Sequence, residues 1–167
     1  GTGAVDHYEA VRYEGYGAGG VAIIVEALTD NRNRTAPEVR SLMSKYGGAL
    51  GETNSVAFQF KRIGQILYPA SIGSADTVFE AAVEAGADNV ESNESAHEIA
   101  TAIEDYHGTL EKMVERFGAP ESSGFVWLPL NTVSVSGDHA ASLMKLLNAL
   151  DDLDDVQNVY TTAIIED

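Results

Sequence analysis

The stretch Val21-Ala-Ile-Ile-Val-Glu-Ala-Leu28, followed directly by Thr29-Asp-Asn-Arg-Asn-Arg-Thr35, decides how the chain is organised. Its first half is an apolar run with several β-branched residues, which predicts a buried strand. Its second half is polar, so its backbone and side chains need water or a ligand, and we expect a surface loop. A helix is predicted to begin near Ala36.

Capping signals place the start of that helix. Thr35 is expected as the N-cap, with Glu38 completing a capping box and Pro37 tolerated in the first turn. Gly47 would stop the helix after Tyr46. The apolar residues expected on its inner face are Val39, Leu42, Met43 and Tyr46. Two arginines and two asparagines would then lie beside a helix N-terminus, where free N–H groups and the helix dipole favour an anion.

The predicted loop is therefore a candidate phosphate-binding surface. Guanidinium groups can hold phosphate oxygens with two hydrogen bonds each, which favours Arg32 and Arg34 as ligands. Arg40 and Lys45 fall on other faces of the helix and would extend the cationic edge. The alternative is a solvated turn whose arginines pair with nearby carboxylates. The residues alone leave both interpretations open.

Upstream of this stretch, residues 8–16 alternate and are rich in aromatics, which predicts a strand. Gly17-Ala-Gly-Gly20 would join it to the buried strand as a hairpin. Residues 15–20 also match the G-x-G-x-x-G pattern, but a dinucleotide-binding pattern must open a helix, and here it opens a strand. We therefore expect no nucleotide cofactor. Tyr16 is interpreted as either a packing residue or a base-stacking platform.

Downstream, residues 63–130 read as one complete unit. Its predicted elements, in order, are a strand at 63–68, a helix at 74–85, strands at 88–91 and 98–103, a helix at 105–117 and a strand at 124–130. This β-α-β-β-α-β order is ferredoxin-like. The residues expected to point inward from the first of these helices are Val78, Phe79, Ala82 and Val83.

The segments on either side of residues 63–130 together show the same predicted order of elements. Its elements are a strand at 21–28, a helix at 36–46, strands at 56–60 and 132–135, a helix at 138–150 and a strand at 156–162, with the strand at 8–16 added. We therefore predict an α+β fold in which one ferredoxin-like (βαββαβ) module is inserted into another. The predicted domains are residues 1–62 with 131–167, and residues 63–130.

Charge is distributed unevenly along the 167 residues. The net charge is −16, yet residues 1–62 hold seven basic and seven acidic side chains, whereas residues 63–167 hold three basic and nineteen acidic ones. An acidic body repels nonspecific polyanions, so the N-terminal part is the plausible polyanion contact. A halophile-like acidic surface would give the same total. No apolar run approaches the roughly 18 residues that span a bilayer, and we expect no membrane partner.

The sequence shows no pattern typical of an enzyme. The chain has no cysteine, and its four histidines, His7, His97, His107 and His139, lie on different predicted elements. Glu91, Glu94 and Glu98 beside His97 could form a metal site, but a solvated acidic edge is the more usual arrangement. The run Asp151–Asp155 lacks the glycine and the final glutamate of a calcium loop and reads as a turn. We expect no catalysis, no metal and no small-molecule cofactor.

Three segments resemble the YebC/PmpR family, which includes the mitochondrial translational activator of cytochrome oxidase subunit one. They are Tyr13-Glu-Gly-Tyr-Gly-Ala-Gly-Gly-Val-Ala-Ile-Ile-Val-Glu-Ala-Leu-Thr-Asp-Asn-Arg-Asn-Arg-Thr35, Gly47-Gly-Ala-Leu-Gly-Glu52 and Asp154-Asp-Val-Gln-Asn-Val-Tyr160. The resemblance covers essentially the whole chain, in order. It implies a ferredoxin-like domain inserted in a second α+β domain, preceded by a basic three-helix domain that we expect to be missing here. Ala18 stands where the family commonly has proline, and Tyr46 where it commonly has histidine.

The resemblance implies a cytoplasmic regulator of gene expression. Family members are described as DNA-binding transcriptional regulators, and others as ribosome-associated translation factors that would contact rRNA or tRNA; a module that binds only protein is a third possibility. The expected nucleic-acid-binding residues are Tyr16, Gly17, Gly19, Asn31, Arg32, Asn33, Arg34, Thr35, Arg40 and Lys45.

Overall fold

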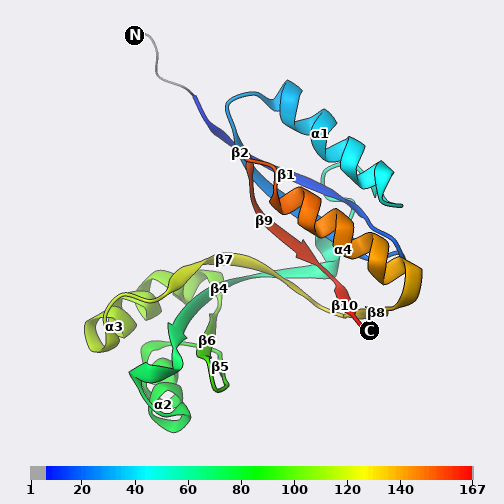
Figure 1. Cartoon of the computed structure of the whole chain (residues 1–167). Coiled ribbons are helices and arrows are strands. Elements are labelled where there is room, and N and C mark those ends of the chain that lie inside the picture. The colour runs from blue at the N-terminus through cyan, green and yellow to red at the C-terminus, as the bar shows by residue number, and fades with distance from the viewer. Residues whose placement is uncertain (1–6, 167) are drawn as a thin grey trace. The chain divides into compact units, whose positions relative to one another are not determined.

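The computed structural model describes residues 7–166, which divide into two units. The first unit comprises the chain up to Lys61 and again from Pro129 onward, and the second comprises Arg62–Leu128. Figure 1 labels the helices and strands of both units. The fold is α+β and consists of two ferredoxin-like modules, one inserted into the other, as the sequence predicts.

A four-stranded antiparallel sheet forms the first unit's framework, in the order β3-β1-β2-β9. Its strands are β1 (Glu9–Tyr16), β2 (Ala22–Thr29), β3 (Ala49–Leu50) and β9 (Val156–Thr161). β1 and β2 pair along their whole length, from Glu9 opposite Thr29 to Tyr16 opposite Ala22. β1 and β2 are the two inner strands, and the apolar run of β2 can be buried on both faces.

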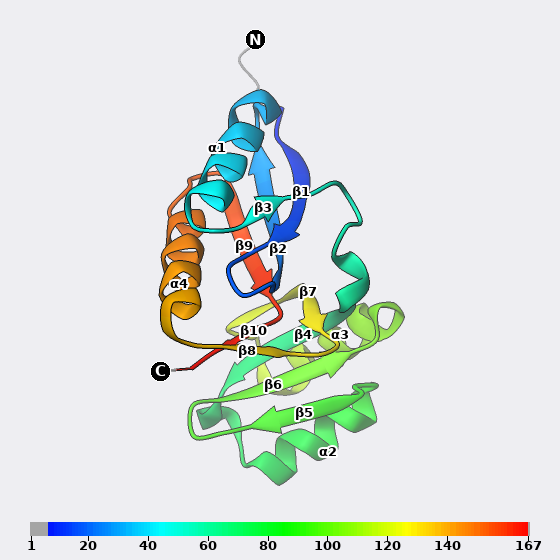
Figure 2. The same cartoon turned by 90° about the vertical axis from the view of Figure 1, so that its right-hand side faces the viewer.

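Two helices cover one face of this sheet: α1 (Arg32–Lys45) and α4 (Gly137–Asp151). Figure 2 shows them side by side along the same side of β1, β2 and β9. Fully buried residues that join the helices to the sheet are Ile23, Val25, Val39, Met43, Leu143 and Leu146. The helix over 36–46 thus buries Val39 and Met43, while Leu42 and Tyr46 pack at the edge of the core.

Two parts of the first unit differ from the prediction. Residues 56–60 were expected to form a strand, but Ala57–Gln59 form a 3-10 turn, η1. The backbone N–H groups of Val56 and Ala57 donate to the carboxylate of Glu14, so they are not available to a strand ladder. The short strand β8 (Val133–Val135) pairs in parallel with β10 (Ala163–Ile165), which the sequence did not predict.

The second unit has the strand order β5-β6-β4-β7. Its elements are β4 (Phe60–Pro69), the 3-10 turn η2 (Ala70–Ile72), α2 (Ala75–Ala85), β5 (Asn89–Ser92), β6 (Ala96–Thr101), the 3-10 turn η3 (Ile103–Asp105), α3 (Tyr106–Phe117) and β7 (Ser122–Pro129). The first strand of the unit lies between its third and fourth, as the ferredoxin-like topology requires.

Local signals set the ends of α2. The Ser74 hydroxyl caps its start by accepting from Thr77 N at 3.1 Å, and Gly86, with φ 112°, ends it in the left-handed region. The prediction that Phe79 and Val83 point inward was wrong, since they are 47% and 45% exposed. The buried face of α2 is instead formed by Val78, Ala81, Ala82 and Ala85, one helical stripe shifted toward α3.

Candidate nucleic-acid interface

The polar stretch after β2 is mostly helix rather than loop. α1 begins at Arg32, with Asn31 as its N-cap in extended conformation, so only Asp30 and Asn31 connect β2 to α1. The prediction of Thr35 as N-cap was wrong. Thr35 lies in the first turn of α1 and is completely buried.

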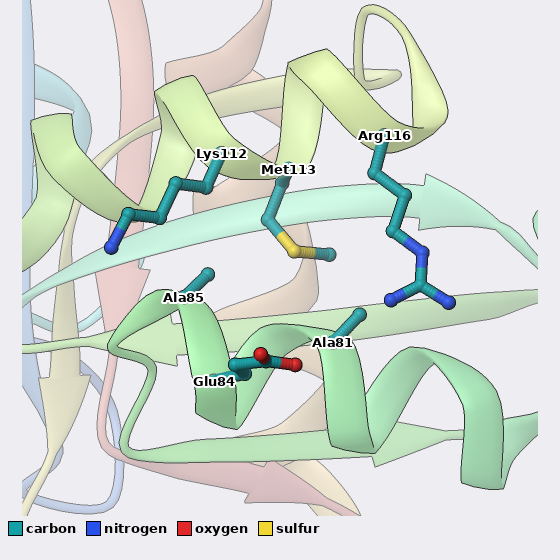
Figure 3. A pocket seen from close by; sticks show the side chains of 6 residues that line it. All are labelled: Ala81, Glu84, Ala85, Lys112, Met113 and Arg116. Carbon is teal, nitrogen blue, oxygen red and sulfur yellow. The ribbon is translucent and has the colours of Figure 1, made fainter.

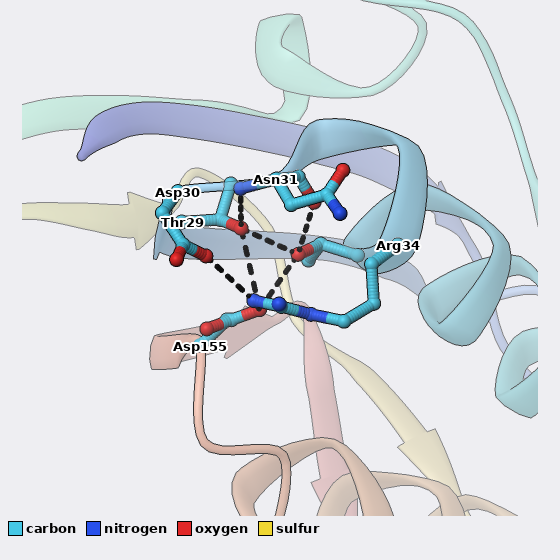
Figure 4. Close-up of polar contacts among 6 residues, drawn as sticks. Thr29, Asp30, Asn31, Arg34 and Asp155 are labelled. Carbon is cyan, nitrogen blue, oxygen red and sulfur yellow. Dashed lines mark hydrogen bonds and ion pairs between the residues drawn. The ribbon is translucent and has the colours of Figure 1, made fainter. Parts of the chain in front are cut away.

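A hydrogen-bond cluster explains the position of Thr35 (Figure 4). Its hydroxyl donates to Asp155 Oδ2 at 2.7 Å and lies 2.8 Å from the Thr29 hydroxyl. The Thr29 hydroxyl also accepts from Asn31 N at 2.9 Å. The backbone N–H of Thr35 donates to the carbonyl of Asn31 at 3.2 Å, so Thr35 lies inside the first turn and is not its N-cap. The contacts of Asp155 tie the turn before β9 to the start of α1, about 120 residues away in the sequence.

Arg34 belongs to the same cluster. Its guanidinium donates to Asp155 Oδ2 at 2.8 Å and to Asp30 Oδ1 at 2.9 Å. Hydrogen bonds to Asp155, and secondly to Asp30, raise the pKa of Arg34. The bond from Arg34, followed by that from Thr35, lowers the pKa of the Asp155 carboxyl. For Arg34 the structure therefore supports the alternative in which an arginine of this stretch pairs with nearby carboxylates.

Arg32 has a different environment. Its Nε lies 3.6 Å from Glu9 Oε1, and the two side chains are 62% and 50% exposed. An exposed ion pair at that distance contributes little and exchanges readily with another anion. Asn31 and Asn33 are exposed on either side of Arg32. The part of the stretch that is accessible to a ligand is therefore Asn31–Asn33.

The charge of α1 is opposite to that of the chain. Its 14 residues contain four cationic side chains, Arg32, Arg34, Arg40 and Lys45, and one acidic one, Glu38, for a net charge of 4 − 1 = +3. All four cations are exposed. The whole chain has a net charge of −16. Because Asp30 and Asp155 compensate Arg34, the cations of α1 that can attract a polyanion are Arg32, Arg40 and Lys45.

The hairpin residues lie at the other end of the sheet. Tyr16, Gly17 and Gly19 are separated from Asp30 by the eight residues of β2, which at about 3.3 Å each span about 26 Å. The structure thus does not bring them next to Arg32 and Arg34, although the sequence suggested an adjoining hairpin. They lie instead beside the C-terminal end of α1, where Lys45 is exposed.

Packing explains the glycines of this hairpin. A Cβ at Gly17 would lie 2.8 Å from Ile23 Cδ1 and 3.0 Å from Leu143 Cδ1. Gly19 has φ +86°, and a Cβ there would lie 2.7 Å from Val135 Cγ1. Gly17 is buried, so its function in the fold is close packing of the hairpin against the core. Tyr16 is 40% exposed at the end of β1.

His97 and its acidic neighbours were the sequence candidate for a metal site. No group of three or more His, Asp or Glu side chains in this range is placed to hold a metal ion. His97 is buried and bonded to Ser92 and to the carbonyl of Gly73, whereas Glu98 is exposed. None of the helices described is both long and apolar enough to cross a membrane.

Asp155 is the functional candidate that sequence reasoning missed. It was interpreted only as part of a turn between a helix and a strand, although it lies in the third segment that carries the family resemblance. Its contacts with Thr29, Arg34 and Thr35 are long-range, and no local pattern predicts them.

Comparison with known proteins identifies the family. The model of the TACO1/YebC second and third domain matches residues 8–163. The chain is also similar to the crystal structure of a conserved hypothetical protein from Aquifex aeolicus, with 40% sequence identity and a TM-score of 0.89. That match covers 98% of this chain and 68% of the other. The chain therefore belongs to the TACO1/YebC family.

Proposed function

We propose that this protein is a non-enzymatic regulator of gene expression that binds nucleic acid through α1. The observation that carries the proposal is that α1 bears three exposed cations outside the Asp155 cluster, Arg32, Arg40 and Lys45, in a chain whose net charge is −16. The contrast between the cations of α1 and the acidic remainder of the chain favours a polyanion that approaches α1. The family description, which is that of transcription regulators, agrees with a nucleic-acid partner.

Individual residues of α1 would have different tasks. Arg32, Arg40 and Lys45 would contact phosphate oxygens, since all three are exposed. Arg34 and Asp155 would fix the start of α1, so that the unpaired N–H groups of its first turn face the ligand. Asn31 and Asn33 would add hydrogen bonds to phosphate or sugar.

Two kinds of nucleic-acid partner fit this proposal. A transcription regulator would bind duplex DNA, and the family description favours it. A translation factor would bind rRNA or tRNA on the ribosome. The acidic remainder of the chain favours that alternative, because it excludes generic duplexes and leaves a small cationic surface for a shaped RNA site.

A charge-matched pair of variants tests the proposal. Arg32→Ala/Arg40→Ala removes two cations from α1, and Lys112→Ala/Arg116→Ala removes two exposed cations from α3. Each variant is compared with the wild type in gel shifts with promoter-length DNA and in co-sedimentation with ribosomes, at matched salt. We expect only the α1 variant to lose binding and to reduce its salt dependence by about two phosphate contacts.

The outcomes separate the alternatives. Loss of ribosome binding alone supports the translation factor, and loss of sequence-dependent DNA binding alone supports the transcription regulator. Equal affinities of the two variants, or no binding of DNA or ribosomes by the wild type, would refute the nucleic-acid proposal. The remaining hypothesis would then be a module that binds only protein.

A further inference from the structure

The face of the first unit's sheet opposite α1 and α4 carries a turn that is held by a buried carboxylate. In β1, Tyr13 packs toward the helices, so its neighbour Glu14 points to the other face. Glu14 is 1% exposed and accepts from the backbone N–H groups of Asn54, Val56 and Ala57 at 2.7, 3.0 and 2.7 Å. Arg12 Nε adds a fourth hydrogen bond at 3.1 Å.

These bonds keep Glu14 ionised. Burial acts to raise the pKa of Glu14, but the three backbone N–H groups and the Arg12 guanidinium outweigh it, and the net pKa is lowered. A carboxylate with four donors is a firm anchor. The segment from Asn54 to Gln59 is therefore fixed against the sheet, with Val56 completely buried beneath it.

The anchored segment exposes one large aromatic side chain, that of Phe58. In the strand predicted for residues 56–60, the side chains of Val56, Phe58 and Phe60 would share one buried face. The 3-10 turn η1 keeps Val56 and Phe60 buried, at 0% and 6% exposure, but leaves Phe58 70% exposed. Phe58 is more exposed than any other large apolar side chain described in residues 7–166.

A second aromatic ring lies beside the turn that carries Phe58, and exposed polar residues flank Phe58 along the chain. Gln59 Nε2 donates to the hydroxyl of Tyr16 at 3.3 Å, which places a second, 40% exposed aromatic ring beside η1. Lys61 follows three residues after Phe58 and is exposed, and so is Asn54 at the start of the turn. Leu130, which is 56% exposed, donates its backbone N–H to the carbonyl of Gln59 at 2.9 Å, so an apolar side chain also lies beside the turn.

We propose that Phe58, with Tyr16 beside its turn and Lys61 three residues further along the chain, is a stacking platform for an unpaired nucleobase. An aromatic ring stacks on any base, and a neighbouring lysine neutralises the adjoining phosphate. The proposal rests on the proposed function and narrows its ligand. In a duplex the faces of the bases are covered by their neighbours, so this site takes a single strand or an RNA loop.

Fluorescence anisotropy with a labelled single-stranded RNA, and with the same RNA annealed to its complement, tests the platform on the full chain. Phe58→Ala should weaken binding of the single strand about tenfold and change duplex binding little. Phe58→Trp should retain the affinity, because indole also stacks. Phe79→Ala, which removes a 47% exposed ring from α2, is the matched control and should have no effect.

The salt dependence separates this proposal from the previous one. Stacking involves no counterion release, so Phe58→Ala should leave the slope of affinity against salt unchanged, whereas Arg32→Ala/Arg40→Ala should reduce it. If the arginine variant weakens binding and Phe58→Ala does not, the platform is overturned, the nucleic-acid function stands, and Phe58 is left to a protein partner. Equal losses on single strand and duplex would overturn stacking. No binding of either RNA by the wild type would overturn both proposals.

Discussion

Removal of the Asp155 carboxylate tests whether the contacts of this residue, which precedes β9, stabilise the start of α1. In Asp155→Ala, the buried hydroxyls of Thr29 and Thr35 lose their shared acceptor. A buried polar group left without its partner costs about 1–3 kcal/mol. The two hydroxyls still lie 2.8 Å from each other, and Thr35 still reaches Asn31 O at 3.3 Å, so the low end of that range applies to each. We expect a loss of about 2 kcal/mol in the free energy of unfolding.

Thermal unfolding followed by far-UV circular dichroism measures this loss. For a chain of this length, about 2 kcal/mol corresponds to a decrease of about 4–8 °C in melting temperature. Asp154→Ala is the matched control, because Asp154 is the neighbouring exposed aspartate of the same turn. A melting temperature of Asp155→Ala equal to that of the control would refute the structural role of the cluster.

The pH dependence adds an independent check on Asp155. Its pKa is lowered in the folded state, so its contribution is complete above the unfolded pKa and is lost as pH falls through the folded pKa. The difference in stability between wild type and Asp155→Ala should therefore be largest near neutral pH and decrease on acidification. A difference that grows on acidification would contradict the assignment.

Two further predictions concern the framework of the first unit. In Glu14→Gln, the amide NH₂ replaces a carboxylate oxygen that accepts hydrogen bonds from backbone N–H groups. We therefore expect the free energy of unfolding to fall by about 1–3 kcal/mol, measured by urea unfolding near neutral pH. Since the pKa of Glu14 is lowered by folding, this loss should fade as pH drops through the folded pKa; a pH-independent loss would contradict the ionised anchor. In Gly19→Ala, the positive φ and the 2.7 Å approach to Val135 should lower stability by about 1–2 kcal/mol, whereas Gly124→Ala, with open space around its Cβ, is the control. Equal melting temperatures of the two alanine variants would show that the hairpin tolerates a side chain.

Most of the fold follows from patterns local to the sequence. The apolar run of β2, the helical spacing of Val39 and Met43, and the glycine stops after the helices are each contained in a few neighbouring residues. These signals predict the type of each element, because the spacing of its apolar residues shows which face is buried. The order of the elements then follows from their positions in the chain. They do not predict exact ends, since α1 begins four residues earlier than its apolar pattern suggests.

Two of the features that the sequence did not predict depend on long-range hydrogen bonds. Thr35 has the local pattern of an N-cap, but Asp155, about 120 residues away, engages its hydroxyl inside the helix. Residues 56–60 alternate like a strand, but Glu14 of β1 takes their N–H groups and makes a turn. In both places a buried or half-buried carboxylate overrides the local preference. Leaving that carboxylate without hydrogen-bond donors would cost more free energy than a strand ladder or a helix cap contributes.

The candidate site shows the same division. The sequence identified Arg32, Arg34, Arg40 and Lys45 as a group of cations, and the structure places all four on α1 with exposed side chains. Geometry alone distinguishes them, since Arg34 is held by Asp30 and Asp155 whereas Arg32 is weakly paired. The glycines of the hairpin were grouped with these cations by resemblance, yet their positions are explained by packing.

A titration of the ¹⁵N-labelled protein with a short single-stranded RNA at low salt, followed by backbone amide NMR shifts, tests the central claim most directly. Our account predicts that the amides of Arg32–Lys45 shift most, that those of η1 shift with them, and that those of α2 and α3 remain unchanged. Shifts concentrated in the second unit, or none in α1 at saturating RNA, would contradict nucleic-acid binding through α1.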